Sequence, residues 1–198
     1  MLESQIVDCL KEGQVSYETI LNKEIHYIYK KNGQYRELVL KAKKNGFMHL
    51  CGIESYLDPK TKRAVSPSHF YELVKSDNIS PSHLVIKTDG TTTLKLNVIK
   101  YLNELLNHKI RVIDDQVIFY DFSFDRGLRT GREIFALALV ESGKYVYSPY
   151  SLLNLKAPNT NTRPLTTTYP VHSIFIRTIR GDEEVIYRSS EYETYLQT

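Results

Sequence analysis

The sequence predicts an α+β fold, with N-terminal helices and a small β-hairpin followed by a meandering antiparallel β-sheet of about four to six strands. Three observations lead to this prediction. Apolar residues recur at helical spacing in the first half of the chain, Asn32-Gly33 separates two extended runs, and the pattern beyond residue 110 is that of strands. We divide the 198 residues into an N-terminal helical extension, residues 1–22, and one α+β domain, residues 23–198.

The extension is predicted to hold two short helices, because apolar residues at helical spacing stop at Gly13 and Ser16 is placed to cap a second helix. In residues 25–30 one set of side chains alternates with another at a period of two, and residues 35–41 form a second extended run. The Asn-Gly pair between the two runs is the strongest short-range signal for a β-hairpin.

Two further helices are predicted before the sheet. Ser66-Pro67 opens the first, with serine as the N-cap and proline in the first turn. Asp89-Gly90 forms a tight turn, after which a longer helix presents one apolar stripe to the core. The residues of that stripe are Leu94, Val98, Leu102 and Leu105.

The second half of the chain is predicted to be strands. Residues 110–113 and 117–122 flank Asp114-Asp115-Gln116 and suggest a hairpin, in which the two aspartates are turn residues rather than a metal site. Residues 134–140 form an almost continuous apolar run, typical of a central strand. Residues 171–179 and 184–188 are expected to pair with each other.

Composition excludes several classes of protein. No apolar run is long enough to span a membrane, and the start of the chain does not resemble a signal peptide. Two cysteines, Cys9 and Cys51, suggest no disulfide framework and fit a reducing, cytoplasmic location. There is no zinc spacing, P-loop, dinucleotide fingerprint, nucleophile elbow or HExxH motif, so we predict no cofactor and no metal.

A modest basic excess favours a nucleic-acid partner. The net charge is +3, with lysines and arginines clustered around residues 41–44 and 60–63, and the chain holds 15 tyrosines but no tryptophan. Tyrosine suits base stacking and phosphate contacts as well as core packing.

The segment around His49 carries the first functional hypothesis. Phe47, Leu50 and Ile53 recur every three residues, so a helical turn after Gly46 would bury all three on one side. His49 would then lie at the edge of the buried stripe, where its pKa can shift and it can act as an acid or base. The alternative is a partly buried histidine bonded to a main-chain carbonyl.

The polar residues suit one metal-free reaction, the cleavage of RNA by its neighbouring 2′-hydroxyl. This reaction needs a base, an acid and cations around the phosphorus. His69 and Tyr71 are two residues apart on a helix, so both cannot point into one site. Lys95 flanks an apolar stripe, where a lysine often lies along the surface instead. The polar residues considered are His49, His69, Tyr71, Lys95, Arg129, Arg132, Tyr147, Ser148, Tyr150 and Ser151.

Four stretches resemble the phage-associated barnase/EndoU/colicin/RelE-like nuclease domains, and their fourth subgroup in particular. These are Phe47-Met48-His49-Leu50-Cys51-Gly52-Ile53, Phe70-Tyr71, Asp89-Gly90-Thr91-Thr92-Thr93-Leu94-Lys95-Leu96, and residues 145–153. The resemblance covers residues 25–155, and Cys51 stands where threonine is expected. It implies a toxin-type hydrolase of phages or mobile elements that cleaves RNA without metal, with helices preceding a small antiparallel sheet.

The resemblance assigns roles to several residues. It implies that His49 is the acid or base and Lys95 a cation for the phosphate or the transition state. By position it adds Tyr147, Ser148 and Ser151 as catalytic candidates. Our substrate-binding candidates are Tyr71, Arg129 and Arg132, the two arginines from charge alone.

Two other functions stay open. The chain could be a non-catalytic phage or mobile-element protein that binds and inhibits a host or defence protein, since fold does not fix function. It could also bind nucleic acid without cleaving it. An RNase of this kind would have RNA as its partner, together with a neutralising or target protein. The sequence does not determine the oligomeric state, nor whether residues 156–170 form a lid, a partner-binding arm or a disordered loop.

Overall fold

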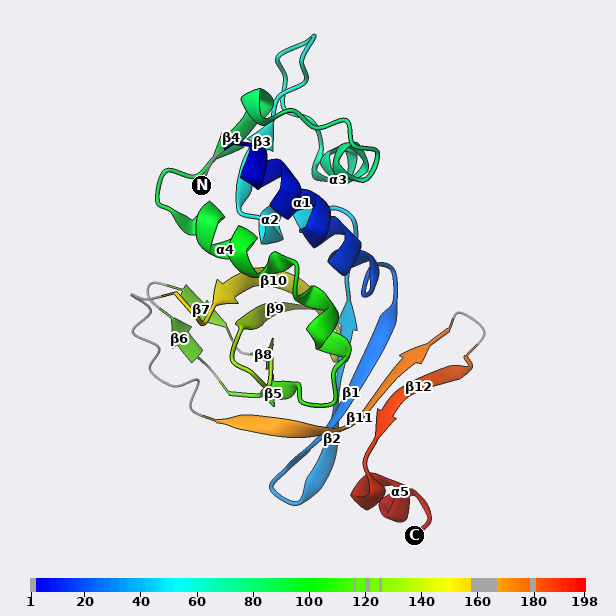
Figure 1. The fold of residues 1–198 in the computed structure, drawn as a ribbon. Coiled ribbons are helices and arrows are strands. Elements are labelled where there is room, and N and C mark those ends of the chain that lie inside the picture. Colours follow the sequence, from blue (N-terminus) through cyan, green and yellow to red (C-terminus); the bar gives the residue numbers. More distant parts are fainter. Residues whose placement is uncertain (1–2, 116, 120–121, 125, 158–166, 179–180) are drawn as a thin grey trace.

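Helices gather at one end of a large curved sheet, while the last strand and helix project at the other end (Figure 1). No helix in the described part of the chain is long and apolar enough to cross a membrane. The predicted loop at 156–170 falls largely outside the described residues. The computed structural model describes the whole chain except residues 1–2, 116, 120–121, 125, 158–166 and 179–180.

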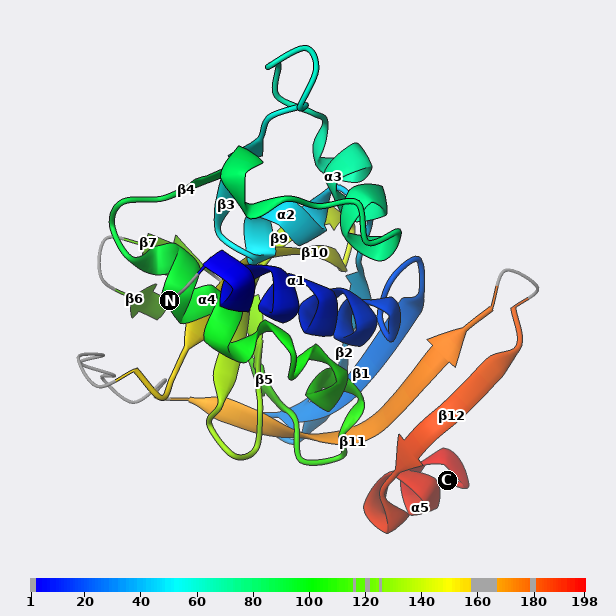
Figure 2. The ribbon, with the colours of Figure 1, turned by 45° about the horizontal axis from the view of Figure 1, so that its top comes forward.

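The first helix, α1 (Glu3–Glu18), runs without interruption, so the predicted stop at Gly13 and the second helix capped by Ser16 are wrong. Gly13 is buried, and a Cβ atom at this position would lie only 2.6 Å from Cγ2 of Ile99. Glycine is therefore placed here because it lets α1 pack closely on α4 (Thr91–Ile99). Figure 2 shows the two helices side by side above the sheet.

The predicted hairpin is confirmed, since β1 (Glu24–Lys31) and β2 (Gln34–Lys41) pair across Asn32 and Gly33. Both turn residues have positive φ angles, 53° and 77°, as the tight turn requires. The hairpin is not a separate small sheet, however. It belongs to the main sheet, because β1 also pairs with β11 (Thr168–Arg177) and β2 pairs with β10 (Val146–Asn154).

The α+β class is confirmed, but the main sheet has eight strands, more than the four to six predicted. It is also mixed rather than purely antiparallel, because β2 runs parallel to β10. The pairing of β1 with β11 closes a ring of seven strands, to which β12 is added. In spatial order the strands are β1, β2, β10 (Val146–Asn154), β9 (Phe135–Gly143), β8 (Arg126–Arg129), β5 (Arg111–Ile113), β11 (Thr168–Arg177) and β12 (Glu183–Arg188).

The predicted hairpin of residues 110–113 with 117–122 is wrong. Strand β5 pairs with β8 and β11 instead, while β6 (Val117–Phe119) pairs with β7 (Phe122–Phe124). Two other predictions for this half are confirmed. The apolar run at 134–140 forms the inner strand β9, and β11 pairs with β12.

The remaining helices are short. Ser66 caps α3 (Pro67–Lys75) as predicted, with its hydroxyl accepting a hydrogen bond from the amide of His69 at 3.2 Å. The longer helix predicted after Gly90 ends early, since α4 stops at Ile99 and a 3₁₀ helix, η2 (Leu102–Leu106), follows. The other short elements are α2 (Gly46–Leu50), β3 (Ile53–Tyr56), η1 (Pro81–His83), β4 (Leu84–Ile86) and α5 (Ser190–Leu196).

The main core lies between α1, α2, α3 and α4 and the side of the sheet that faces them. Its largest fully buried side chains are aromatic. They are Tyr17, Tyr27, Tyr56, Tyr71, Phe47, Phe70 and Phe135. This packing fixes α2 and α4 against β10, which is where the candidate site lies.

Candidate functional site

Helix α2 presents His49 at the edge of the core. Phe47 and Leu50 are fully buried and Ile53 is nearly so, which confirms the spacing argument, while His49 is exposed in the last turn. The helix ends at Leu50, and Gly52, two residues further on, has a φ angle of +73°. The histidine is therefore anchored by its neighbours in sequence and left free to meet a ligand.

Tyr150 holds the ring of His49. The two rings stack with centroids 5.9 Å apart and planes 26° from parallel. The imidazole also donates a hydrogen bond to the main-chain carbonyl of Tyr150. Because that bond occupies one ring nitrogen as a donor, the other nitrogen of the neutral ring is a proton acceptor.

A bulge in β10 points Tyr150 toward α2. Pro149 pairs with Leu139 and Ser151 pairs with Ala138, which leaves Tyr150 as the extra residue of the strand. A bulge of this kind redirects a side chain and is common beside functional sites.

Lys95 of α4 binds the main chain of His49. Its side chain is buried, with 8% of the residue exposed, and its ammonium donates a 3.3 Å hydrogen bond to the main-chain carbonyl of His49. The sequence could not exclude a lysine lying along the surface, but this one is part of the interior wall. Burial, followed by repulsion from Lys87, lowers the pKa of Lys95 to about 8.

The same cations act on His49. Partial burial lowers the pKa of His49 below its usual 6.5, and the charges of Lys95 and Lys87 add to this shift. The neutral ring is thus favoured at pH 7, and the site combines a proton acceptor with two cations.

The side chain of Thr92 ties the segments that follow α2 and precede α4 to α4 itself. The hydroxyl of Thr92 donates to the carbonyl of Gly52 at 2.7 Å and accepts from the amide of Lys87 at 3.2 Å. A Cβ atom on Gly52 would lie 3.0 Å from Cα of Thr92 and 3.1 Å from Cδ of Lys95. On the other side of α4, the amide of Asn154 donates to the carbonyl of Leu94 at 3.0 Å, which ties α4 to β10.

The other catalytic candidates lie along β10 at increasing distance in sequence from Tyr150. Ser151 is its half-buried neighbour. Ser148 donates to the hydroxyl of Ser142 at 3.1 Å, and Tyr147 contacts Arg126.

The three substrate-binding candidates are not part of the His49 cluster. Tyr71 is fully buried, and its hydroxyl donates to Glu18 at 2.5 Å. Arg129 pairs with Glu133 at 2.5 Å, and Arg132 is exposed in the turn between β8 and β9.

Sequence reasoning did not select two residues of the cluster, Lys87 and Tyr150. Tyr150 was among the polar residues considered, but its bulged position depends on the pairing of β10 with β9. Lys87 has no distinctive local pattern, and only its hydrogen bond to Thr92 places it near Lys95.

A comparison with protein families matches residues 9–192 to the family described as phage-Barnase-EndoU-ColicinE5/D-RelE like nuclease 4. This confirms the resemblance seen in the sequence and extends it beyond residues 25–155 in both directions. Comparisons with curated proteins and with solved structures gave no match.

Proposed function

Because the chain belongs to the phage-Barnase-EndoU-ColicinE5/D-RelE like nuclease 4 family, we propose that it is an endoribonuclease that cleaves RNA through the 2′-hydroxyl, without a metal ion. One observation carries this proposal. A histidine with a lowered pKa and a proton-accepting nitrogen belongs to the turn whose main-chain carbonyl is bound by a buried lysine, where α2, α4 and β10 meet.

His49 is the general base in this reaction. Its unbonded ring nitrogen takes the proton of the 2′-hydroxyl, and the 2′-oxygen attacks phosphorus. The bond from phosphorus to the 5′-oxygen then breaks, leaving a 2′,3′-cyclic phosphate and a free 5′-hydroxyl. The bond to the carbonyl of Tyr150 keeps the ring in the required tautomer.

Lys95 and Lys87 are the cations that offset the negative charge of the phosphate. As cations at a partly dry site they stabilise the crowded oxygens of the transition state. Lys95 also gives a proton to the leaving 5′-oxygen, because a lysine with a pKa of about 8 is a far stronger acid than an ordinary lysine. Ser151 remains a polar candidate by its position beside Tyr150.

The test is an RNA-cleavage assay in EDTA that compares the native chain with His49→Ala and Lys95→Ala. His69→Ala and Lys60→Ala are matched controls, because both side chains are exposed on other elements. We expect cleavage that survives EDTA, gives cyclic phosphate ends and is lost only in the two site variants. Circular dichroism and thermal unfolding establish that all variants are folded.

If the folded native chain cleaves neither single-stranded nor structured RNA, the enzyme proposal is wrong. The non-catalytic alternative, binding of a host or defence protein, would then be pursued by co-purification. If cleavage occurs but disappears in EDTA, metal independence fails.

A further inference from the structure

A basic hollow of about 310 Å³ lies where β1 begins and where β2 and β11 end. Four of its eight lining residues are cationic, and one, Glu24, is anionic. The cationic residues are Lys23, Lys41, Lys43 and Arg177.

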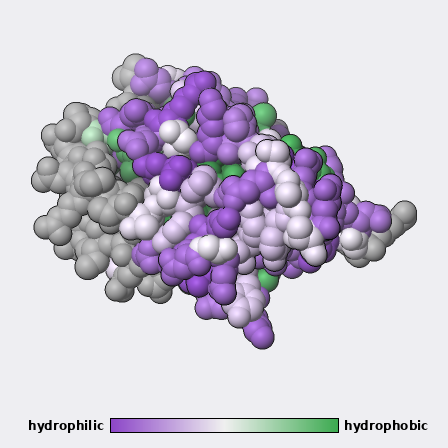
Figure 3. All heavy atoms as spheres, turned by 90° about the horizontal axis from the view of Figure 1, so that it is seen from below, coloured by the Kyte–Doolittle hydropathy of each residue, from purple (hydrophilic) through white to green (hydrophobic). Residues whose placement is uncertain are grey.

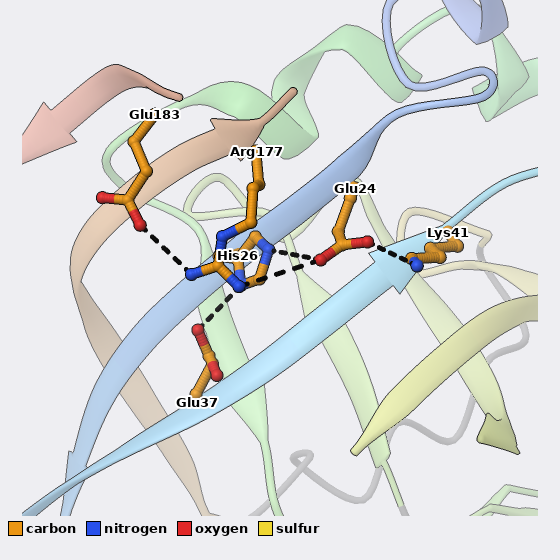
Figure 4. Close-up of polar contacts among 6 residues, drawn as sticks. All are labelled: Glu24, His26, Glu37, Lys41, Arg177 and Glu183. Atoms are coloured by element: carbon orange, nitrogen blue, oxygen red, sulfur yellow. Dashed lines mark hydrogen bonds and ion pairs between the residues drawn. The ribbon is translucent and has the colours of Figure 1, made fainter. Parts of the chain in front are cut away.

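The negative charge of Glu24 is already paired with neighbouring groups (Figure 4). Its carboxylate pairs with Lys41, contacts Arg177 at 4.0 Å and lies 3.1 Å from Nε2 of His26. The ion pair with Lys41 lowers the pKa of Glu24, so this group stays ionised and holds both cations in place. The hollow therefore keeps a positive excess.

Arg177 is held before any ligand arrives. Its guanidinium lies 5.6 Å from the ring centroid of Phe175 and pairs with Glu183 at 3.1 Å. Phe175 in turn stacks on the buried ring of His26, with centroids 4.5 Å apart. Because the side chain is already ordered, a ligand pays less of the entropy of fixing it.

The charged ends nevertheless reach solvent. The side chains of Lys41 and Arg177 are 42% and 41% exposed, and Lys43 is an exposed residue. An anion entering the hollow would meet these groups without displacing the core.

A larger hollow of about 710 Å³ beside Tyr150 is not basic. Three acidic residues line it, Asp114, Asp115 and Glu141, against one arginine, Arg126. Asp114 pairs with Lys31, Arg36 and Arg126, and Asp115 pairs with Lys31, so this hollow has no comparable positive excess to attract a polyanion. The end of the molecule seen in Figure 3 is mainly hydrophilic, with small separate apolar spots over its coloured atoms. The coloured part of this face therefore offers no broad apolar surface to which a partner could bind.

The basic hollow is within reach of the candidate site. Lys43 precedes His49 by six residues, so their Cα atoms are at most about 20 Å apart. An extended single strand of a few nucleotides spans that distance.

We propose that the basic hollow binds a backbone phosphate of a single RNA strand whose cleavage takes place at His49 and Lys95. This inference rests on the proposed function for the identity of the strand. The anion-binding property of the hollow does not depend on it.

The first experiment titrates the full chain with inorganic phosphate and follows amide signals by NMR. We expect shifts at Asn22, Lys43 and Thr178, and their loss in the double variant Lys23→Gln/Lys43→Gln, which leaves the ion pairs of Glu24 intact. Absence of shifts at these amides, or shifts that persist in the variant, would overturn the proposal.

The second experiment measures binding of a 2′-O-methyl RNA oligonucleotide, which cannot be cleaved, across salt concentrations. Losing the contact to this one phosphate should reduce the slope of log Kd against log salt by about 0.7. The matched control is Lys60→Gln/Lys62→Gln, which removes the same charge from an exposed loop. An unchanged slope in the hollow variant, or an equal fall in the control, contradicts the proposal.

A cleavage assay with short and long RNA distinguishes failure of the phosphate site from failure of the proposed function. A dinucleoside monophosphate has a single phosphate, which must lie at His49 to be cleaved and so cannot occupy the hollow. The variant should therefore cleave it like the native chain and lose efficiency only on longer RNA. If the native chain cleaves nothing but phosphate shifts and the salt slope behave as expected, the proposed function fails and the phosphate site stands.

Discussion

The ammonium of Lys95 donates a 3.3 Å hydrogen bond to the main-chain carbonyl of His49. The bond joins a buried cation on α4 to the last turn of α2, whose carbonyls carry partial negative charge. The bond thus fixes the position of the cation relative to the residue that carries the imidazole. The first prediction concerns the proton equilibria of this pair.

Cleavage should follow a bell-shaped pH profile. Activity should rise as His49 loses its proton at a pH below 6.5, and fall as Lys95 loses its proton near pH 8. In Lys95→Arg the rate should drop and the alkaline limb should vanish, because arginine keeps its proton. Rates of RNA cleavage from pH 5 to 10 test this, and an alkaline limb that persists in Lys95→Arg would contradict the role of Lys95 as proton donor.

Lys95→Met should abolish cleavage while stabilising the fold. A buried ammonium is costly, and methionine fills similar space without charge, so the free energy of unfolding at pH 7 should rise by roughly 1 to 3 kcal/mol. The pKa of Lys95 is lowered in the folded chain, so native stability should increase as pH rises from about 8 toward the ordinary 10.5. Urea unfolding measures both effects, and the pH-dependent increase should be smaller in Lys95→Met. A variant that unfolds more easily than the native chain would show that Lys95 is mainly structural.

Tyr150→Ala should raise the pKa of His49. Without the stacked ring, the imidazole becomes better hydrated, so its pKa should rise toward 6.5. Tyr150→Phe keeps the ring and the main-chain carbonyl and should leave the pKa unchanged. NMR titration of the histidine ring signals reads this directly, and identical pKa values in both variants would remove Tyr150 from the site. The lost aromatic contact should cost about 0.5 to 1.5 kcal/mol of stability.

Gly52→Ala should damage the site more than an equivalent change elsewhere. Gly52 and Gly33 both have positive φ angles, 73° and 77°, but only Gly52 has neighbours that a Cβ atom would strike. Gly33→Ala should cost about 1 to 2 kcal/mol of stability through backbone strain alone. Gly52→Ala should cost more and also reduce cleavage, because the new methyl group pushes against Thr92 and Lys95. Equal losses of stability and no loss of cleavage would show that this contact is unimportant.

Several features follow from the sequence because their causes are local. The buried side of the His49 turn depends on residues three apart, the β1–β2 hairpin on Asn32-Gly33, and the start of α3 on the Ser66 cap. The resemblance to the nuclease family was also contained in short runs of residues. These predictions do not require knowing which residues pack against the segment.

The tertiary structure decided what meets His49. Strand β2 joins β10 in parallel although Val39 and its partner Val146 are far apart in sequence, and no local pattern encodes such a pairing. The same long-range packing buries Tyr71, bulges β10 at Tyr150 and brings Lys87 toward Lys95. Gly13 was misread for this reason, because its role is the close contact with Ile99 rather than the end of a helix. Periodicity within one segment reports which face is buried, whereas the partner on that face is chosen by packing over the whole chain.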